Sequence, residues 1–350
     1  MSDTKRMDFV DVAKGVGVLL VILGHIIALN SYAENIIYSF HMPFFFLVSG
    51  MFANADRYKF FPYICRKFKQ LFIPYIVIYI IGALVTYIIP VFDKFSVKDF
   101  FYGFFFDPHM NVGAIWFLPC LFFVNVFFYA LYWLILSKNC FIINFIFILG
   151  FIISPELLIT LKYFLGMSQR VYLPFKMEVA LSSLAIYSIG FLFKKQFLEL
   201  QNLPKKRYER IILPLLCLGV ILVIPAFTGL IAVVNNSYGT DNMMYLLCAI
   251  SGSAFLLCLG TFWKSSKLLK FIGKNSLFIF GFHFIFINLY SLLLTYIYGY
   301  LIQSQRNLNW WQIIVGFVSI SMIMVVLAMI YVTVKKKILE KVTKNKQMTN

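Results

Sequence analysis

The chain has 350 residues, of which 61% are hydrophobic and only 13% are charged, and its mean hydropathy is +0.86. Soluble globular proteins have roughly 45–50% apolar and about 25% charged residues. A soluble core cannot hold this excess of apolar side chains, so the composition excludes a water-soluble enzyme and predicts an integral membrane protein. The six cysteines are scattered without a C-x-x-C pair or a His/Cys cluster, so we expect neither a metal site nor a redox motif.

The apolar runs predict an all-α, polytopic membrane bundle of about ten transmembrane helices, each needing about 20 mostly apolar residues. The predicted spans are residues 8–29, 36–53, 71–90, 115–137, 141–154, 175–193, 211–232, 242–263, 275–296 and 311–334. The sequence shows no internal repeat, and its longest loops are about 20 residues, too short for a soluble domain. We therefore expect one membrane-embedded domain over residues 1–350, with a core at 8–334 and a basic tail at 335–350.

The formal net charge of +17 is concentrated in alternate loops and in the tail. Lys and Arg gather in residues 57–69, 194–210, 264–274 and 335–350, whereas the loops between them carry few. The positive-inside rule places these segments and both termini in the cytoplasm, as in a multi-pass protein of the cell inner membrane. Nucleic acid is not an expected partner. A polybasic surface for anionic lipids or for an acidic cofactor fits the same loops and stays open as an alternative.

The first predicted helix carries ionisable residues, which are costly in a membrane and usually mark a functional site. The eleven steps from Lys14 to His25 turn the helix by about 1100°, within about 20° of three full turns, so both residues share one face. They are about 16 Å apart along the axis, with Lys14 in the cytoplasmic third and His25 in the outer third. Asp11 and Lys14 are three residues apart and are expected to pair.

Other polar residues in the spans are further candidates. His41 is expected about 8 Å below the outer surface, at a depth similar to that of His25. The remaining candidates are Ser49, Glu178, His283 and the basic cluster of Arg66, Lys67 and Lys69.

Each candidate has a structural alternative. A single histidine in a span can simply hydrogen-bond across helices, worth about 1 kcal/mol, and this holds for His41 and His283. Arg66 and Lys69 can be topology anchors, and Trp116 can belong to an interfacial aromatic belt. His109 lies in an outer loop and is assigned no role.

Five motifs in chain order resemble those of the acyltransferase 3 family of membrane-bound O-acyltransferases, particularly its compact members related to sugar O-acetylases. Lys14 and His25, preceded by Asp8 and Asp11, resemble the Arg/Lys-x10-His signature. The others are similar to F-H-M-P-x-F-F-x-x-S-G (Phe40, His41, Met42, Pro43, Ser49, Gly50), R-x-x-R-L-x-x-P-Y (Arg66 to Lys69, Leu71, Pro74, Tyr75), W-F-L (Trp116, Phe117, Leu118) and the late G-x-x-S-L helix start (Gly273 to Leu277, with His283). Lys14 and Lys69 stand where arginine is common, and lysine lacks the bidentate fork of arginine.

The resemblance implies a transferase that moves an acyl group, most often acetyl from acetyl-CoA, onto a hydroxyl of a cell-surface saccharide or its lipid-linked precursor. Acyl-CoA is then a donor substrate, and no tightly bound cofactor is expected. Lys14, Arg66 and Lys69 would hold the anionic donor. His25 would act as a general base or carry the acyl group, with His41 and Asp11 assisting. Substrate binding or structural support falls to Ser49, Trp116, Glu178 and His283.

Two other functions fit about ten spans with buried charges and histidines. One is a carrier of polysaccharide precursors or small solutes, although carriers often show duplicated halves and broken helices, and here the polar residues crowd the first two helices. The other is a membrane partner of a glycan synthase without chemistry of its own. The expected partners are the lipid bilayer, acyl-CoA and a saccharide acceptor, with a homo-oligomer or a glycan-synthesis protein as further alternatives.

Overall fold

The computed structural model of the chain describes residues 7–27, 31–54, 58–88, 96–107, 113–132, 150, 173–202, 207–298 and 308–348. Apart from Gly150, the predicted span at 141–154 lies outside these residues, as does His109. The described residues are almost entirely helical, with one two-stranded hairpin in which β1 (Ile231–Ala232) pairs antiparallel with β2 (Ser237–Tyr238). The prediction of an all-α fold is confirmed.

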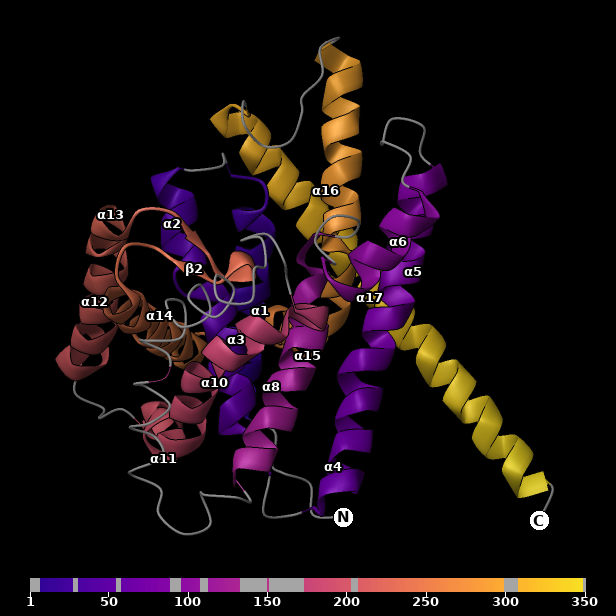
Figure 1. The fold of residues 1–350 in the computed structure, drawn as a ribbon, viewed down its shortest axis with the longest axis horizontal. Coiled ribbons are helices and arrows are strands. Elements are labelled where there is room, and N and C mark those ends of the chain that lie inside the picture. Colours follow the sequence, from indigo (N-terminus) through magenta and orange to yellow (C-terminus); the bar gives the residue numbers. More distant parts are fainter. Residues whose placement is uncertain are drawn as a thin grey trace, which may run out of the picture.

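The helices form a bundle around the first and third helices (Figure 1). The α-helices are α1 (Asp8–Gly24), α2 (Tyr32–Tyr38), α3 (His41–Met51), α4 (Phe60–Lys67), α5 (Ile73–Ile88), α6 (Val97–Phe105), α8 (Phe117–Leu131), α10 (Met177–Leu192), α11 (Lys194–Glu199), α12 (Arg207–Val223), α13 (Pro225–Thr228), α14 (Asn242–Phe262), α15 (Lys267–Lys274), α16 (Ser276–Tyr298) and α17 (Trp310–Met348). Shorter turns are the π-helical η2 (Phe68–Phe72) and the 3₁₀ elements η3 (Gly113–Trp116), η5 (Pro174–Lys176), η6 (Leu200–Asn202) and η7 (Val233–Asn235).

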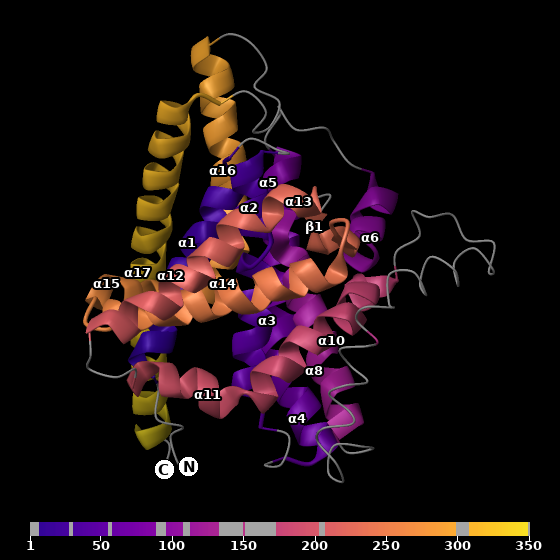
Figure 2. The ribbon, with the colours of Figure 1, turned by 90° about the vertical axis from the view of Figure 1, so that its left-hand side faces the viewer.

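Seven helical stretches among the described residues are long and apolar enough to cross a membrane. They are Phe60–Ile88, Gly113–Leu131, Pro174–Leu192, Ile211–Thr228, Asn242–Phe262, Ser276–Tyr298 and Trp310–Thr343. The protein is therefore a multi-pass membrane protein, and the count of about ten crossings stays a prediction. The C-terminal end of α17 lies at one end of the molecule, whereas α2, α13 and the hairpin lie toward the other (Figure 2).

The predicted second span, 36–53, is not one helix, and this prediction is wrong. The chain breaks at Ser39 and Phe40 between α2 and α3, where Phe40 has a φ of −140° and a ψ of −20°. Pro43 explains the break, because proline has no N–H to donate one turn back and its ring collides with the preceding turn. Proline is tolerated in the first turn of a helix, which is where α3 places it.

The predicted third span is also misplaced at its start. We expected residues 57–69 to be a cytoplasmic segment before a helix at 71, but the helix begins at Phe60 and continues through η2 to Ile88. The basic residues Arg66, Lys67 and Lys69 therefore stand on the helix itself. The predicted start was misplaced because a search for apolar runs leaves charged residues out of a span. Charged side chains are nevertheless tolerated near the end of a span, because they reach toward the membrane interface.

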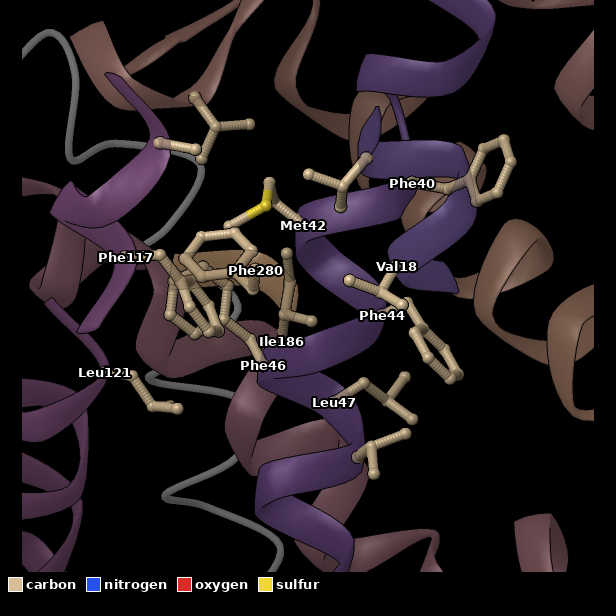
Figure 3. Packing of buried hydrophobic residues seen from close by; sticks show 14 of the residues in the cluster. Val18, Phe40, Met42, Phe44, Phe46, Leu47, Phe117, Leu121, Ile186 and Phe280 are labelled. Atoms are coloured by element: carbon tan, nitrogen blue, oxygen red, sulfur yellow. The ribbon is translucent and has the colours of Figure 1, made fainter. Parts of the chain in front are cut away.

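The centre of the core is α3, whose 11 residues are apolar on nearly every side (Figure 3). Phe46 packs against Phe117 of α8 with ring centroids 4.9 Å apart, and Phe117 packs in turn against Phe280 of α16 at 5.4 Å. A helix that is apolar all round belongs in a protein interior. This explains how so short a helix is stable at the centre of the bundle.

Glycines bring two helix pairs into backbone contact around this centre. A Cβ on Gly273 of α15 would overlap the carbonyl oxygen of Asp11 in α1, and one on Gly50 of α3 would overlap the carbonyl oxygen of Tyr187 in α10. Small residues allow such close approach in membrane bundles, where van der Waals packing drives helix association. Because α1 is fixed in this way, the polar residues at its two ends have defined neighbours.

Candidate functional site

Two cavities lie at opposite ends of α1. The lower cavity, at the N-terminal end of α1, has a volume of about 270 Å³. It is lined by Met7, Val10, Asp11, Lys14, Phe52, Asn54, Tyr58, Tyr63, Arg66, Lys67 and Gln70. These residues come from the start of α1, the segment after α3, and the continuous helix of α4 and η2.

The lower cavity carries an excess of positive charge. Lys14 Nζ lies 2.7 Å from Asp11 Oδ1, so the expected ion pair is present, with Asp11 only 2% exposed. Arg66 and Lys67 add two cations without another lining carboxylate. Such a surface favours an anionic ligand, since charge-assisted hydrogen bonds to phosphate or carboxylate are the stronger ones.

Aromatic residues hold the two cations of α4. Arg66 Nη1 donates a hydrogen bond to the Tyr58 hydroxyl, and the guanidinium lies 5.2 Å from the centroid of the same ring. Lys67 Nζ lies 5.4 Å from the centroid of Tyr63. Cation–π contacts of this kind orient a cation while leaving its donors available.

Lys69, which we predicted to bind the donor, is exposed and is not among the lining residues. Lys67, a member of the same predicted basic cluster, lines the cavity. The sequence contains a signal that Lys67 lines the cavity, because Tyr63, Lys67 and Gln70 are spaced at helical intervals and so lie on one face of the helix.

A buried amide network supports the wall of the lower cavity. The hydroxyls of Tyr63 and Tyr187 each donate to Asn125 Oδ1 at 2.8 Å, and Asn125 Nδ2 donates to the carbonyl of Leu121 at 2.7 Å. Asn125 is fully buried on α8. The network ties α4, α8 and α10 together and fixes Tyr63, which faces the cavity. Asn125 was not among the predicted site residues, although a lone amide inside an apolar span is itself a signal.

The upper pocket lies at the C-terminal end of α1 and is small, about 60 Å³. It is lined by His25, Tyr38, His41, Met42, Ala114, Trp116, Ala232, Val233 and Val234. His25 and His41 therefore line one pocket at similar depth. Trp116 lines the pocket, as do three small apolar side chains from the end of β1 and from η7, namely Ala232, Val233 and Val234.

Tyr38 connects the two histidines. Its hydroxyl is hydrogen-bonded to His25 Nδ1 at 3.2 Å, and its ring lies 4.9 Å from that of His41. We did not anticipate this residue, and the only signal for it is its position three residues before His41.

His283, the residue expected near the middle of its span, also reaches this site. Its ring centroid lies 5.4 Å from that of His25. The Nδ1 atoms of His41 and His283 each lie 2.7 Å from a carbonyl oxygen, of Ile37 and Phe280 respectively. A carbonyl oxygen can only accept, so Nδ1 of both rings carries the proton and Nε2 carries the lone pair.

Two other candidates lie apart from these cavities. Ser49 is half-buried on α3 and is not among the residues lining either one. Glu178 is buried at the start of α10, where its Oε2 accepts a hydrogen bond from the Leu173 N–H at 3.1 Å. In the same region the fully buried Lys176 pairs with Asp107 at 3.3 Å.

The fold and the two cavities define a multi-pass membrane protein with a cation-lined cavity at one end of α1 and a histidine-lined pocket at the other. The chain belongs to the acyltransferase 3 family, since the family model described as an acyltransferase domain matches residues 7–330. Comparisons with curated proteins and with solved structures gave no match.

Proposed function

We propose that the protein is an O-acetyltransferase of the cell inner membrane that transfers acetyl from acetyl-CoA to a hydroxyl of a cell-surface saccharide or its lipid-linked precursor. The observation that carries this proposal is the arrangement of α1, which places a cation-lined cavity at one end and a histidine pocket at the other. Membership of an acyltransferase family supports the reaction class.

The lower cavity is the proposed donor site. The positive-inside rule places its end of the molecule in the cytoplasm, where acyl-CoA is found. Lys14, Arg66 and Lys67 offer three cations to the phosphates of the donor, and the guanidinium of Arg66 can bind a phosphate through two parallel hydrogen bonds. The pantetheine arm would then extend along α1 toward the upper pocket.

The upper pocket is the proposed site of acyl transfer. Neutral His25 takes the proton of the acceptor hydroxyl while the hydroxyl oxygen attacks the thioester carbon, a role worth about 10²- to 10⁴-fold in rate. The new C–O bond forms, the C–S bond breaks, and His25 returns the proton to the departing thiolate of CoA. His41 presents a second imidazole to the same pocket and can orient the acceptor.

If the proposal is correct, substitutions at the two ends of α1 change different kinetic constants. Those in the lower cavity change KM for acetyl-CoA, and those in the upper pocket change kcat. In membrane vesicles supplied with radiolabelled acetyl-CoA, we expect Lys14→Ala to raise KM for acetyl-CoA by about 10- to 100-fold, the value of one hydrogen bond to a charged group. We expect His25→Ala to lower kcat by at least about 10²-fold with little change in KM. Matched expression and melting temperature serve as the folding control. Unchanged acetyl transfer in His25→Ala would refute the assignment, and a Lys14→Ala defect that saturating donor does not relieve would refute the donor site.

A further inference from the structure

The upper pocket is so small that its size limits the acyl group it can hold. Its volume is about 60 Å³, whereas one water molecule needs about 10–15 Å³ of such space. The pocket therefore has room for about four to six non-hydrogen atoms. An acetyl thioester brings a methyl carbon, the carbonyl carbon and oxygen, and the sulfur, and the acceptor adds its hydroxyl oxygen. This set of atoms fills the pocket, and a butyryl group, with two more carbons, exceeds it.

The residues that line the pocket differ in polarity. His25, Tyr38 and His41 bring polar atoms to it. Apart from Trp116, the other lining residues are apolar, namely Met42, Ala114, Ala232, Val233 and Val234. In the proposed reaction the acyl carbonyl lies beside His25, so the alkyl end of the acyl group is left to the apolar side chains. Apolar surface is favoured there because its burial removes it from water.

The hairpin that supplies part of this apolar wall is packed against the rest of the protein. Val233 is only 6% exposed, and the neighbouring Ile231 is fully buried and pairs with Tyr238 across the hairpin. The ring of Tyr238 in turn packs against that of Tyr245 of α14, with centroids 4.7 Å apart. Densely packed interiors yield little, so a longer acyl chain displaces this wall only at the cost of strain.

We propose that Ala232, Val233 and Val234 determine the length of the acyl group, so that the protein transfers short groups of about two or three carbons and rejects longer ones. This inference rests on the proposed function and adds to it the residues that select the acyl group. A longer donor still binds, because the cations of the lower cavity face phosphates that every acyl-CoA carries. The selection therefore acts on kcat, and butyryl-CoA occupies the donor site unproductively.

Two substitutions change the pocket in opposite directions. Val233→Ala removes two methyl groups from the wall, which makes room for the two methylenes that butyryl has beyond acetyl. Ala232→Val adds two methyl groups and narrows the pocket, at a strand position where valine is favoured. Ile231→Val is the matched control, because it shortens a fully buried side chain of the same hairpin that is not among those lining the pocket.

The experiment measures kcat/KM for radiolabelled acetyl-CoA and butyryl-CoA in membrane vesicles that contain the full chain. The ratio of the two values is taken within one preparation, so a loss of folded protein in a variant cancels. We expect the wild type to favour acetyl-CoA by at least about 100-fold, at about 10-fold or more for each added methylene. We expect this ratio to fall by at least about 10-fold in Val233→Ala, to rise in Ala232→Val and to stay unchanged in Ile231→Val.

Butyryl-CoA is also expected to inhibit acetyl transfer by the wild type competitively, with an inhibition constant close to the Kd of acetyl-CoA. An absence of inhibition would place the selection at donor binding and overturn the inference. Equal kcat/KM for both donors in the wild type, or the same ratio in Val233→Ala as in Ile231→Val, would also overturn it. A wild-type protein that transfers neither acyl group would instead overturn the proposed function.

Discussion

The contact between α1 and α15 leads to a prediction that links packing to donor binding. Gly273 of α15 lies against α1, where an added Cβ would overlap the Asp11 carbonyl oxygen and lie 2.7 Å from its carbon and 2.9 Å from the amide nitrogen of Gly15. Ordinary contacts to carbon are about 3.5–4.0 Å, and the Cβ would lie 1.7 Å from the Asp11 carbonyl oxygen, so Gly273→Ala requires the two helices to separate by about 1.5 Å. Rotating a side chain cannot relieve the overlap, because both contacting groups are backbone.

The size of the effect follows from two opposing terms. Overpacking a well-packed interface costs about 1–3 kcal/mol, and alanine regains up to about 1 kcal/mol over glycine in a helix. Because the contacting groups are backbone and cannot rotate away, the cost lies at the upper end of its range, and the net destabilisation expected for Gly273→Ala is about 2 kcal/mol. The movement of α1 also displaces Lys14 relative to Arg66 across the lower cavity, so KM for acetyl-CoA is expected to rise while the upper pocket retains its chemistry.

Gly219 of α12 is the matched control, because nothing lies within 4 Å of a Cβ placed there. Gly219→Ala is expected to be neutral or slightly stabilising. The assay is the melting temperature of the detergent-purified protein, followed by a donor titration in vesicles. A Gly273→Ala variant as stable as Gly219→Ala would show that α1 and α15 do not meet at this distance.

Three further predictions concern the lower cavity. Asn125→Leu leaves the hydroxyls of Tyr63 and Tyr187 without their acceptor, so it should lower the melting temperature and raise KM for acetyl-CoA; a stable variant with normal KM would refute the network's role. Lys67→Ala should weaken CoA binding by about 10- to 100-fold and Lys69→Ala should not, as measured by titration calorimetry, and the reverse order would contradict the lining. Raising NaCl to 1 M, where the Debye length is about 3 Å, should weaken CoA binding, and salt-independent binding would argue against an ionic site.

The sequence predicted the all-α fold class and the placement of Asp11, Lys14 and His25 along one helix, because both depend on local patterns. Apolar runs identify spans, and helical spacing placed Asp11 beside Lys14 and His25 near the other end of the same helix. These features require no knowledge of how helices pack. The break between α2 and α3 was also encoded locally, by Pro43, but a hydropathy pattern does not register it.

The remaining features depend on packing between distant segments. The choice of Lys67 over Lys69 follows from the rotation of a helix that continues through η2, and the approach of His283 to His25 joins residues 258 positions apart in the chain. The turn over the upper pocket comes from residues 232–234, within a stretch expected to be a span end and a loop. The amino-acid composition and the hydrophobic period of a segment do not specify its contacts with distant segments.

We propose that α1 connects donor binding to acyl transfer, and acetyl transfer by the purified protein tests this connection directly. The protein in liposomes is given radiolabelled acetyl-CoA and a saccharide and lipid extract of its own cells as acceptor, beside the His25→Ala variant. We expect labelled, alkali-labile acetyl esters with the wild type and at least about 10²-fold less with the variant. Tight CoA binding without ester formation, or equal product from both proteins, would contradict it.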